Sequence, residues 1–156
     1  HAAGIPFVFD PGQGMPMFNG DELLDFVEKA DYIAVNDYEA QLLQSLTGNA
    51  LNKLATRVNA LIETKGAEGS VIYAQGKQFK IPAVRPEKVI DPTGCGDAYR
   101  AGLLYGIAQG MDWQETGQLA SLMGTLKIAY RGGQNHRYTR DEIGQRYFEA
   151  FGSRIF

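Results

Sequence analysis

The chain has 156 residues, of which 44% are hydrophobic and 21% charged, and its formal net charge is −3. This balance suits one globular domain with a sizeable core, and the mild acidic charge argues against a protein that holds nucleic acid by bulk charge. No apolar run approaches the ~20 residues that a membrane helix needs. The single cysteine excludes an intrachain disulfide and a multi-cysteine metal site. We therefore expect a cytoplasmic protein without nucleic-acid or membrane partners.

The first part of the chain alternates short apolar runs with helical patterns. Strands are expected over 5–9, 32–35 and 60–64. A turn over 10–14 precedes a helix that starts at about Asp21. A second helix, capped by Asn36 or Asp37, is expected to end near Gly48, and a short third helix to cover 51–58. The chain begins without Met and enters a strand almost at once, so we expect residue 1 to lie within a longer protein.

The second part begins with a glycine-rich turn over 65–69. A strand over 70–74 and a hairpin to 79–81 follow, then an extended connector over 82–90. Helices are expected over 98–109, 112–130 and 139–151, with a loop over 131–135. Buried strands that alternate with helices predict an α/β fold: a mainly parallel sheet with helices on both faces and an added β-hairpin.

The run Asp91-Pro92-Thr93-Gly94-Cys95-Gly96-Asp97 precedes the first of these later helices. Its glycines let the backbone turn tightly, and the first N–H groups of a helix attract anions because they lack intrahelical partners. A carboxylate beside a bound anion can take a proton from an attacking hydroxyl. An anion cradle with an adjacent base is the basic equipment for phosphoryl transfer. A plain strand-to-helix turn is the alternative interpretation.

This run resembles the Asp-Thr-x-Gly-Ala-Gly-Asp signature of the ribokinase-like (PfkB) family of sugar and nucleoside kinases, and it does not fit a Walker loop. Cys95 stands where the family usually has Ala, and Pro92 replaces a Thr. The resemblance implies a ribokinase-like fold. It also implies that residues 1–156 are the C-terminal, ATP-binding part of a single domain whose N-terminal half and lid are missing. Within it, Asp97 would be the general base, and the N–H groups of residues 94–97 would hold the transferring phosphoryl group.

Two further segments resemble family motifs. Asn36 and Glu39 match an Asn-x-x-Glu motif that positions Mg²⁺, although they can equally cap a helix. The run 64–69 matches a Thr-x-Gly-x-x-Gly turn that touches the nucleotide, although it can equally be a plain turn between strands. The nucleotide-binding residues that the resemblance implies there are Thr64, Gly66 and Gly69.

Other positions carry weaker implications of the same resemblance. Asp91 and Thr93, with carbonyls of the 131–136 loop, would bind a monovalent cation such as K⁺, or Asp91 simply caps a turn. Ser121, Met123 and Gly132 lie where the family packs adenine, although Met123 also fits an apolar stripe. The C-terminal region contains five basic residues: Lys127, Arg131, Arg137, Arg140 and Arg146. Most of them are expected to be solvated, and one of them is a candidate for a contact with phosphate.

The sequence therefore predicts an ATP- and Mg²⁺-dependent kinase that phosphorylates a hydroxyl of a small sugar or nucleoside. Along its whole length the chain is similar to bacterial, adenosine-kinase-like members of the family. This resemblance favours an adenosine-like substrate, with ribose, fructose or another carbohydrate as alternatives. A non-catalytic nucleotide-binding homologue and an isolated fragment without activity of its own are the rival interpretations. A homodimer stays open. A zinc site at His1 or His136, and a nucleophilic role for Cys95, are disfavoured because suitable partner residues are absent nearby in sequence.

Overall fold

Five strands form one sheet in the order β1-β2-β3-β4-β5. They are β1 (Val8–Phe9), β2 (Tyr32–Asn36), β3 (Ala60–Thr64), β4 (Ser70–Ala74) and β5 (Lys77–Ile81). The first three strands are parallel, whereas β4 runs antiparallel to β3. β4 is joined to β5 by Gln75 and Gly76, both at positive φ, which is the conformation that a two-residue hairpin turn requires. The predicted sheet, mainly parallel with an added hairpin, is confirmed.

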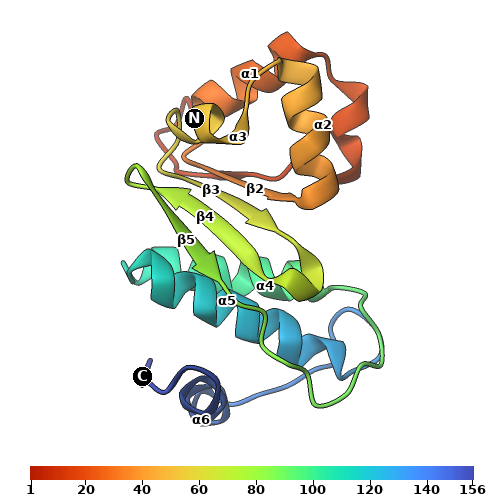
Figure 1. Cartoon of the computed structure of the whole chain (residues 1–156), viewed down its shortest axis with the longest axis vertical. Coiled ribbons are helices and arrows are strands. Elements are labelled where there is room, and N and C mark those ends of the chain that lie inside the picture. Colours follow the sequence, from red (N-terminus) through yellow and green to blue (C-terminus); the bar gives the residue numbers. More distant parts are fainter. The chain divides into compact units, whose positions relative to one another are not determined.

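The computed structural model describes residues 1–156, which form two units: residues 1–66 with 70–80, and residues 67–69 with 81–156. In the first unit, α1 (Gly20–Lys29), α2 (Asp37–Thr47) and α3 (Leu51–Ala55) gather beside β2 and β3 (Figure 1). The core between them is built from fully buried apolar side chains, among them Leu23, Val27, Ile33, Leu43 and Leu61. α1, α2, β2 and β3 therefore share one core.

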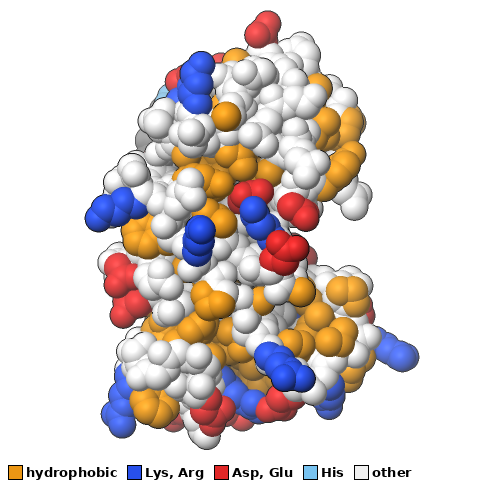
Figure 2. Space-filling model, viewed as in Figure 1, with side chains coloured by type: hydrophobic (Ala, Val, Ile, Leu, Met, Phe, Trp, Pro, Cys, Tyr) orange, Lys and Arg blue, Asp and Glu red, His pale blue; other side chains and the backbone are white.

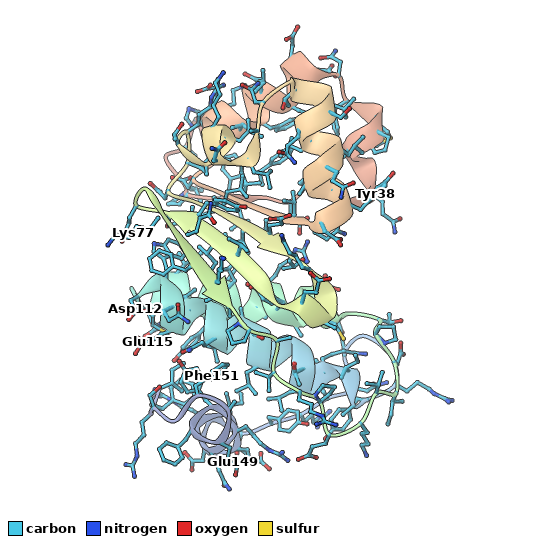
Figure 3. The ribbon with its side chains drawn as sticks, in the orientation of Figure 1. Tyr38, Lys77, Asp112, Glu115, Glu149 and Phe151 are labelled. Atoms are coloured by element: carbon cyan, nitrogen blue, oxygen red, sulfur yellow. The ribbon has the colours of Figure 1, made fainter.

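The second unit contains α4 (Cys95–Ala108), α5 (Trp113–Ile128) and α6 (Arg140–Phe151). α5 packs along α4 on one side and contacts α6 on the other (Figure 1). Asp112 caps α5 by accepting a hydrogen bond from the N–H of Glu115 at 2.8 Å, and both residues lie at the beginning of that helix in Figure 3. Glu149 and Phe151 lie on α6 in the same view, and Phe151 packs against the apolar cluster that joins the two helices.

The structure corrects several predicted boundaries. β1 covers only Val8–Phe9 of the expected strand 5–9, because Pro6 has no N–H to donate and the N–H of Phe7 donates to the Asp31 side chain instead. The last three residues of the expected turn over 10–14 begin a 3₁₀ helix, η1 (Gly12–Met17), and a second short one, η2 (Gly66–Glu68), lies in the 65–69 turn. α3 ends three residues early at Ala55, where the Thr56 hydroxyl donates to the Lys53 carbonyl.

Small residues let α4 and α5 approach closely. A Cβ added at Gly102 of α4 would lie 2.7 Å from Cα of Ala120 and 3.0 Å from its nitrogen. Those atoms are main chain and cannot move aside as the end of a flexible side chain can. The small residues expected along this helix therefore do serve close packing.

We expect Gly102→Ala to destabilise the protein by roughly 1–3 kcal/mol, the usual effect of overpacking, even though Ala favours a helix over Gly. Gly144→Ala is the matched control, because there the new Cβ meets only a side-chain atom of Phe156, at 3.3 Å. Urea unfolding monitored by circular dichroism measures both variants. Equal stabilities would show that the helices can separate without cost.

Candidate active site

The turn before α4 places two free main-chain N–H groups beside a carboxylate. Gly94 caps the helix in the left-handed conformation (φ 78°), and the first bond of the helix runs from the Ala98 N–H to the Gly94 carbonyl at 2.9 Å. The N–H of Cys95 donates to the Pro92 carbonyl at 3.1 Å, inside the turn. The N–H groups of Gly96 and Asp97 have no main-chain acceptor. Both residues are exposed, so the helix start and its dipole face solvent.

The helix starts three residues earlier than the sequence predicts, at Cys95 rather than Ala98. Asp97 consequently lies within the first turn of α4 and not ahead of it. A negative side chain in the first turn is favoured by the helix dipole.

Asp91 ties this turn to the loop after α5. Its Oδ2 accepts the N–H of Gly132 at 2.7 Å, and its Oδ1 accepts the N–H of Thr93 at 2.9 Å. These donors, Gly132 first, hold the pKa of the Asp91 carboxyl far below its usual range, and the Lys127 ammonium lowers this pKa further. The alternative expected for Asp91, a turn-capping carboxylate, is what these contacts describe.

Because the pKa of Asp91 is lower in the folded than in the unfolded state, its carboxylate contributes stability above its unfolded pKa. That contribution is fully present above about pH 4 and disappears as the pH falls toward the folded pKa. We therefore expect Asp91→Asn to lower the melting temperature most at neutral pH and least at pH 3. Thermal melts of both proteins across this range measure the gap. A gap that stays constant or widens in acid would contradict the assigned contacts.

Cys95 fills the inside of the same turn. It is half-buried, and its Sγ lies 4.0 Å from the Asp91 carbonyl. Burial raises the pKa of the Cys95 thiol, which disfavours the reactive thiolate at neutral pH. The thiol therefore acts as a small packing group, in line with the expectation that Cys95 is not a nucleophile.

In the first unit, three candidate residues meet at the ends of two parallel strands. Asn36 and Thr64 are register partners at the carboxyl ends of β2 and β3. Asn36 caps α2, with its Oδ1 accepting the N–H of Glu39 at 2.8 Å while Oε2 of Glu39 accepts the N–H of Asn36, also at 2.8 Å. Glu39 is 8% exposed and has its second oxygen, Oε1, available to accept from water. Neighbouring Tyr38 projects into solvent (Figure 3).

The remaining candidates have structural contacts of their own. Gly66 lies in η2 and is exposed, whereas Gly69 is buried, and a Cβ there would lie 2.1 Å from the Ile81 carbonyl oxygen. The Ser121 hydroxyl donates to the Pro82 carbonyl at 2.9 Å and so fixes the connector after β5. The glycine at 69 and the serine at 121 are therefore required by packing, whatever they do with a ligand.

One charged residue near the turn differs from its sequence-based expectation. The sequence groups Lys127 with basic residues that are mostly solvated, yet its side chain is fully buried. It lies eleven residues after the buried Thr116 and seven after the buried Ala120, on the face that contains small residues. That spacing shows which face of the helix Lys127 lies on, but it does not show the acceptors that its ammonium group finds there. Elsewhere, Lys and Arg are interspersed with Asp and Glu on the face shown in Figure 2.

Comparisons with known proteins identify the family to which the chain belongs. Residues 3–140 match the profile of the pfkB family of carbohydrate kinases. The chain belongs to this family. A nucleoside kinase of Methanocaldococcus jannaschii is 36% identical over 138 residues, covering 88% of this chain and 46% of that protein. A ribokinase of Bacillus subtilis is 28% identical over 92% of this chain and 46% of its own length.

The solved structures agree with these sequence matches. The structure of Burkholderia thailandensis nucleoside kinase in complex with inosine superposes with a TM-score of 0.97 at 56% identity, over 99% of this chain and 51% of that one. Its complex with ADP-inosine gives a TM-score of 0.96. The predicted ribokinase-like α/β fold and kinase family are confirmed, and the chain spans about half the length of the relatives it matches. No helix is both long and apolar enough to cross a membrane.

Proposed function

We propose that the protein is an ATP-dependent nucleoside kinase, to which residues 1–156 contribute the C-terminal, nucleotide-binding part. The observation that carries this proposal is the start of α4, where unpaired N–H groups of Gly96 and Asp97 lie next to the exposed Asp97 carboxylate. Membership of the pfkB family of carbohydrate kinases supports it, as does the similarity to a nucleoside kinase.

In this proposal each residue of the turn has a separate task. The N–H groups of Gly96 and Asp97 stabilise negative charge on the transferring phosphoryl oxygens. Gly94 gives the turn its shape, and Cys95 fills its interior. The Asp97 carboxylate accepts the proton of the attacking hydroxyl. A carboxylate is a weak base for an alcohol. A weak base is sufficient here because the loose transition state of phosphoryl transfer needs little activation of the nucleophile.

The first unit supplies the residues proposed for the metal and the nucleotide. Asn36 and Glu39 would position Mg²⁺, with the available Oε1 of Glu39 accepting from a metal-bound water. Thr64 and Gly66 would contact the nucleotide beyond the end of β3. When bound, Mg²⁺–ATP supplies the phosphoryl group and neutralises its charge. Potassium is left out of the proposal, because Asp91 already has the Lys127 ammonium beside it.

For the substrate we propose a purine nucleoside. The adenosine-like preference inferred from the sequence is compatible with the inosine that the Burkholderia relative binds. Ribose and fructose remain the alternatives, because a ribokinase also lies among the relatives. A homodimer, the adenine-binding roles of Ser121 and Gly132 and a cytoplasmic location stay predictions.

The test is ATP-dependent phosphorylation by the full-length protein of a panel containing inosine, adenosine, cytidine, ribose and fructose. We expect a kcat/KM for inosine or adenosine well above that for either free sugar. A protein that binds ADP but phosphorylates none of the panel would be the non-catalytic homologue. Residues 1–156 alone, assayed in parallel, are expected to show no turnover.

A further inference from the structure

Lys127 is a buried cation with no assigned task. It lies in the last turn of α5, and its side chain has no exposed surface. Removing an ammonium group from water is costly unless hydrogen bonds and neighbouring charge compensate it. A lysine at this position therefore needs a reason, and its contacts supply one.

The ammonium group joins two loops that lie next to the start of α4. Nζ donates to the carbonyl of Asp91 at 2.7 Å and to the carbonyl of Tyr130 at 3.1 Å. Asp91 opens the turn that leads into α4, and Tyr130 immediately precedes the loop that contains Gly132. A single buried charge thus holds the main chain at the beginning of both segments.

Other bonds in the same place make this link tight. The Asp91 carboxylate accepts from Gly132, and the N–H groups of Ile90 and Asp91 donate to the Ile128 carbonyl at 2.9 and 3.1 Å. The last carbonyls of α5 carry partial negative charge. The Asp91 carboxylate interacts electrostatically with the ammonium group, which lowers the pKa of Asp91. Negative groups therefore converge on one side chain, and Lys127 is the positive charge that balances them.

We propose that Lys127 is a positioning residue for phosphoryl transfer, an internal cation that fixes Asp91 and, through it, the turn that leads into the start of α4, where Gly96 and Asp97 lie. This inference rests on the proposed kinase function. It has two consequences. Turnover depends on the charge at residue 127, and no dissolved monovalent cation is needed to order the turn.

The first experiment compares Lys127→Met with Leu126→Ala in the full-length protein. Met keeps most of the length of the lysine stem and removes the charge. Leu126 is the preceding residue, 7% exposed in the apolar cluster, and makes none of the turn contacts. We expect Lys127→Met to lower kcat by about 10²-fold, the usual effect of a small misplacement of reacting groups, with the KM for the nucleoside little changed. Leu126→Ala should lower the melting temperature and leave kcat near wild type.

A folded Lys127→Met with wild-type kcat would overturn the proposal. A purely structural role would make both variants lose stability and activity in parallel. If Lys127→Met does not fold, the wild-type protein still decides: after dialysis, its rate should be the same in potassium, sodium and tetramethylammonium chloride. A rate that requires potassium would show that a dissolved cation does the work assigned to Lys127.

Amide hydrogen exchange separates failure of this inference from failure of the proposed function. The N–H groups of Thr93 and Gly132 both donate to Asp91. They should exchange faster in Lys127→Met than in wild type, and at the wild-type rate in Leu126→Ala. This result is expected even if the wild-type protein phosphorylates nothing, an outcome that would overturn the kinase function alone. Unchanged exchange at both amides in the Met variant would overturn the link itself.

Discussion

Asp97→Asn should reduce kcat by roughly 10²–10⁴-fold, the range that general base catalysis contributes, while ADP still binds. Asn keeps the size of the side chain and its place in the first turn of α4, but it cannot accept the proton of the substrate hydroxyl at neutral pH. The N–H groups of Gly96 and Asp97 are main-chain groups and are unaffected by the change. Removing a negative charge next to bound phosphates should leave ADP affinity equal or slightly higher.

Asp112→Asn is the matched control for this variant. Asp112 is also an acid at a helix start, but its carboxylate caps α5 by accepting the N–H of Glu115. Asn caps helices as well as Asp does, so neither stability nor kcat should change. Steady-state kinetics with the preferred nucleoside and calorimetric titration with ADP measure the two effects separately. A kcat for Asp97→Asn within a few-fold of wild type would remove the carboxylate from the role of base.

The parts of the fold that local chemistry determines could be predicted from the sequence. The pair Asn36 and Glu39 forms the expected helix start because each side chain satisfies the other's main-chain N–H. The same is true of Thr139 at the start of α6. The strands β3 and β4 are found at the predicted residues, since each is a short apolar run between turn residues. Such features depend on neighbours within a few positions.

Features that depend on distant contacts could not be predicted in this way. The early start of α4 follows from the left-handed cap at Gly94 and the bond from Cys95 to Pro92, which the presence of glycines alone does not reveal. The buried position of Lys127 depends on carbonyls at residues 91 and 130, one of them 36 positions away. From the pattern of residues along one helix, a lysine is expected to be exposed. The pattern contains no information on acceptors that lie on another segment and allow the lysine to be buried.

The candidate site also has some features that could be predicted from the sequence and others that could not. The residue types in the 91–97 run, an acid after two glycines, are enough to predict an anion site with a base, and this stays a prediction. Which N–H groups remain available cannot be deduced from them, because that depends on the first residue of the helix. The interpretation of Asn36 and Glu39 as helix-capping residues and their proposed role toward magnesium remain compatible, since the cap uses one Glu39 oxygen.

Gly94→Ala should disrupt both the turn and the chemistry. Gly94 has φ 78°, and a Cβ there would lie 2.9 Å from Cα of Gly133 and 3.0 Å from its carbonyl oxygen. The left-handed conformation costs a residue with a Cβ roughly 1–2 kcal/mol, and the contact with the Gly133 main chain adds about 1–3 kcal/mol if the loop cannot retreat. If the turn shifts instead, the N–H groups of Gly96 and Asp97 move with it, and kcat should fall by about 10²-fold.

Gly110→Ala shows the first part of this effect, the conformational cost, without the second. Gly110 also has a positive φ, 66°, but nothing lies within 4 Å of the position of its Cβ. It should therefore show the conformational cost without the clash and keep its kcat. Urea unfolding gives the stability difference between the two variants, and steady-state kinetics gives the difference in turnover. If Gly94→Ala matched Gly110→Ala in both, the turn would tolerate a side chain beside Gly133, and its close approach to that loop could not be what places the phosphoryl-binding N–H groups.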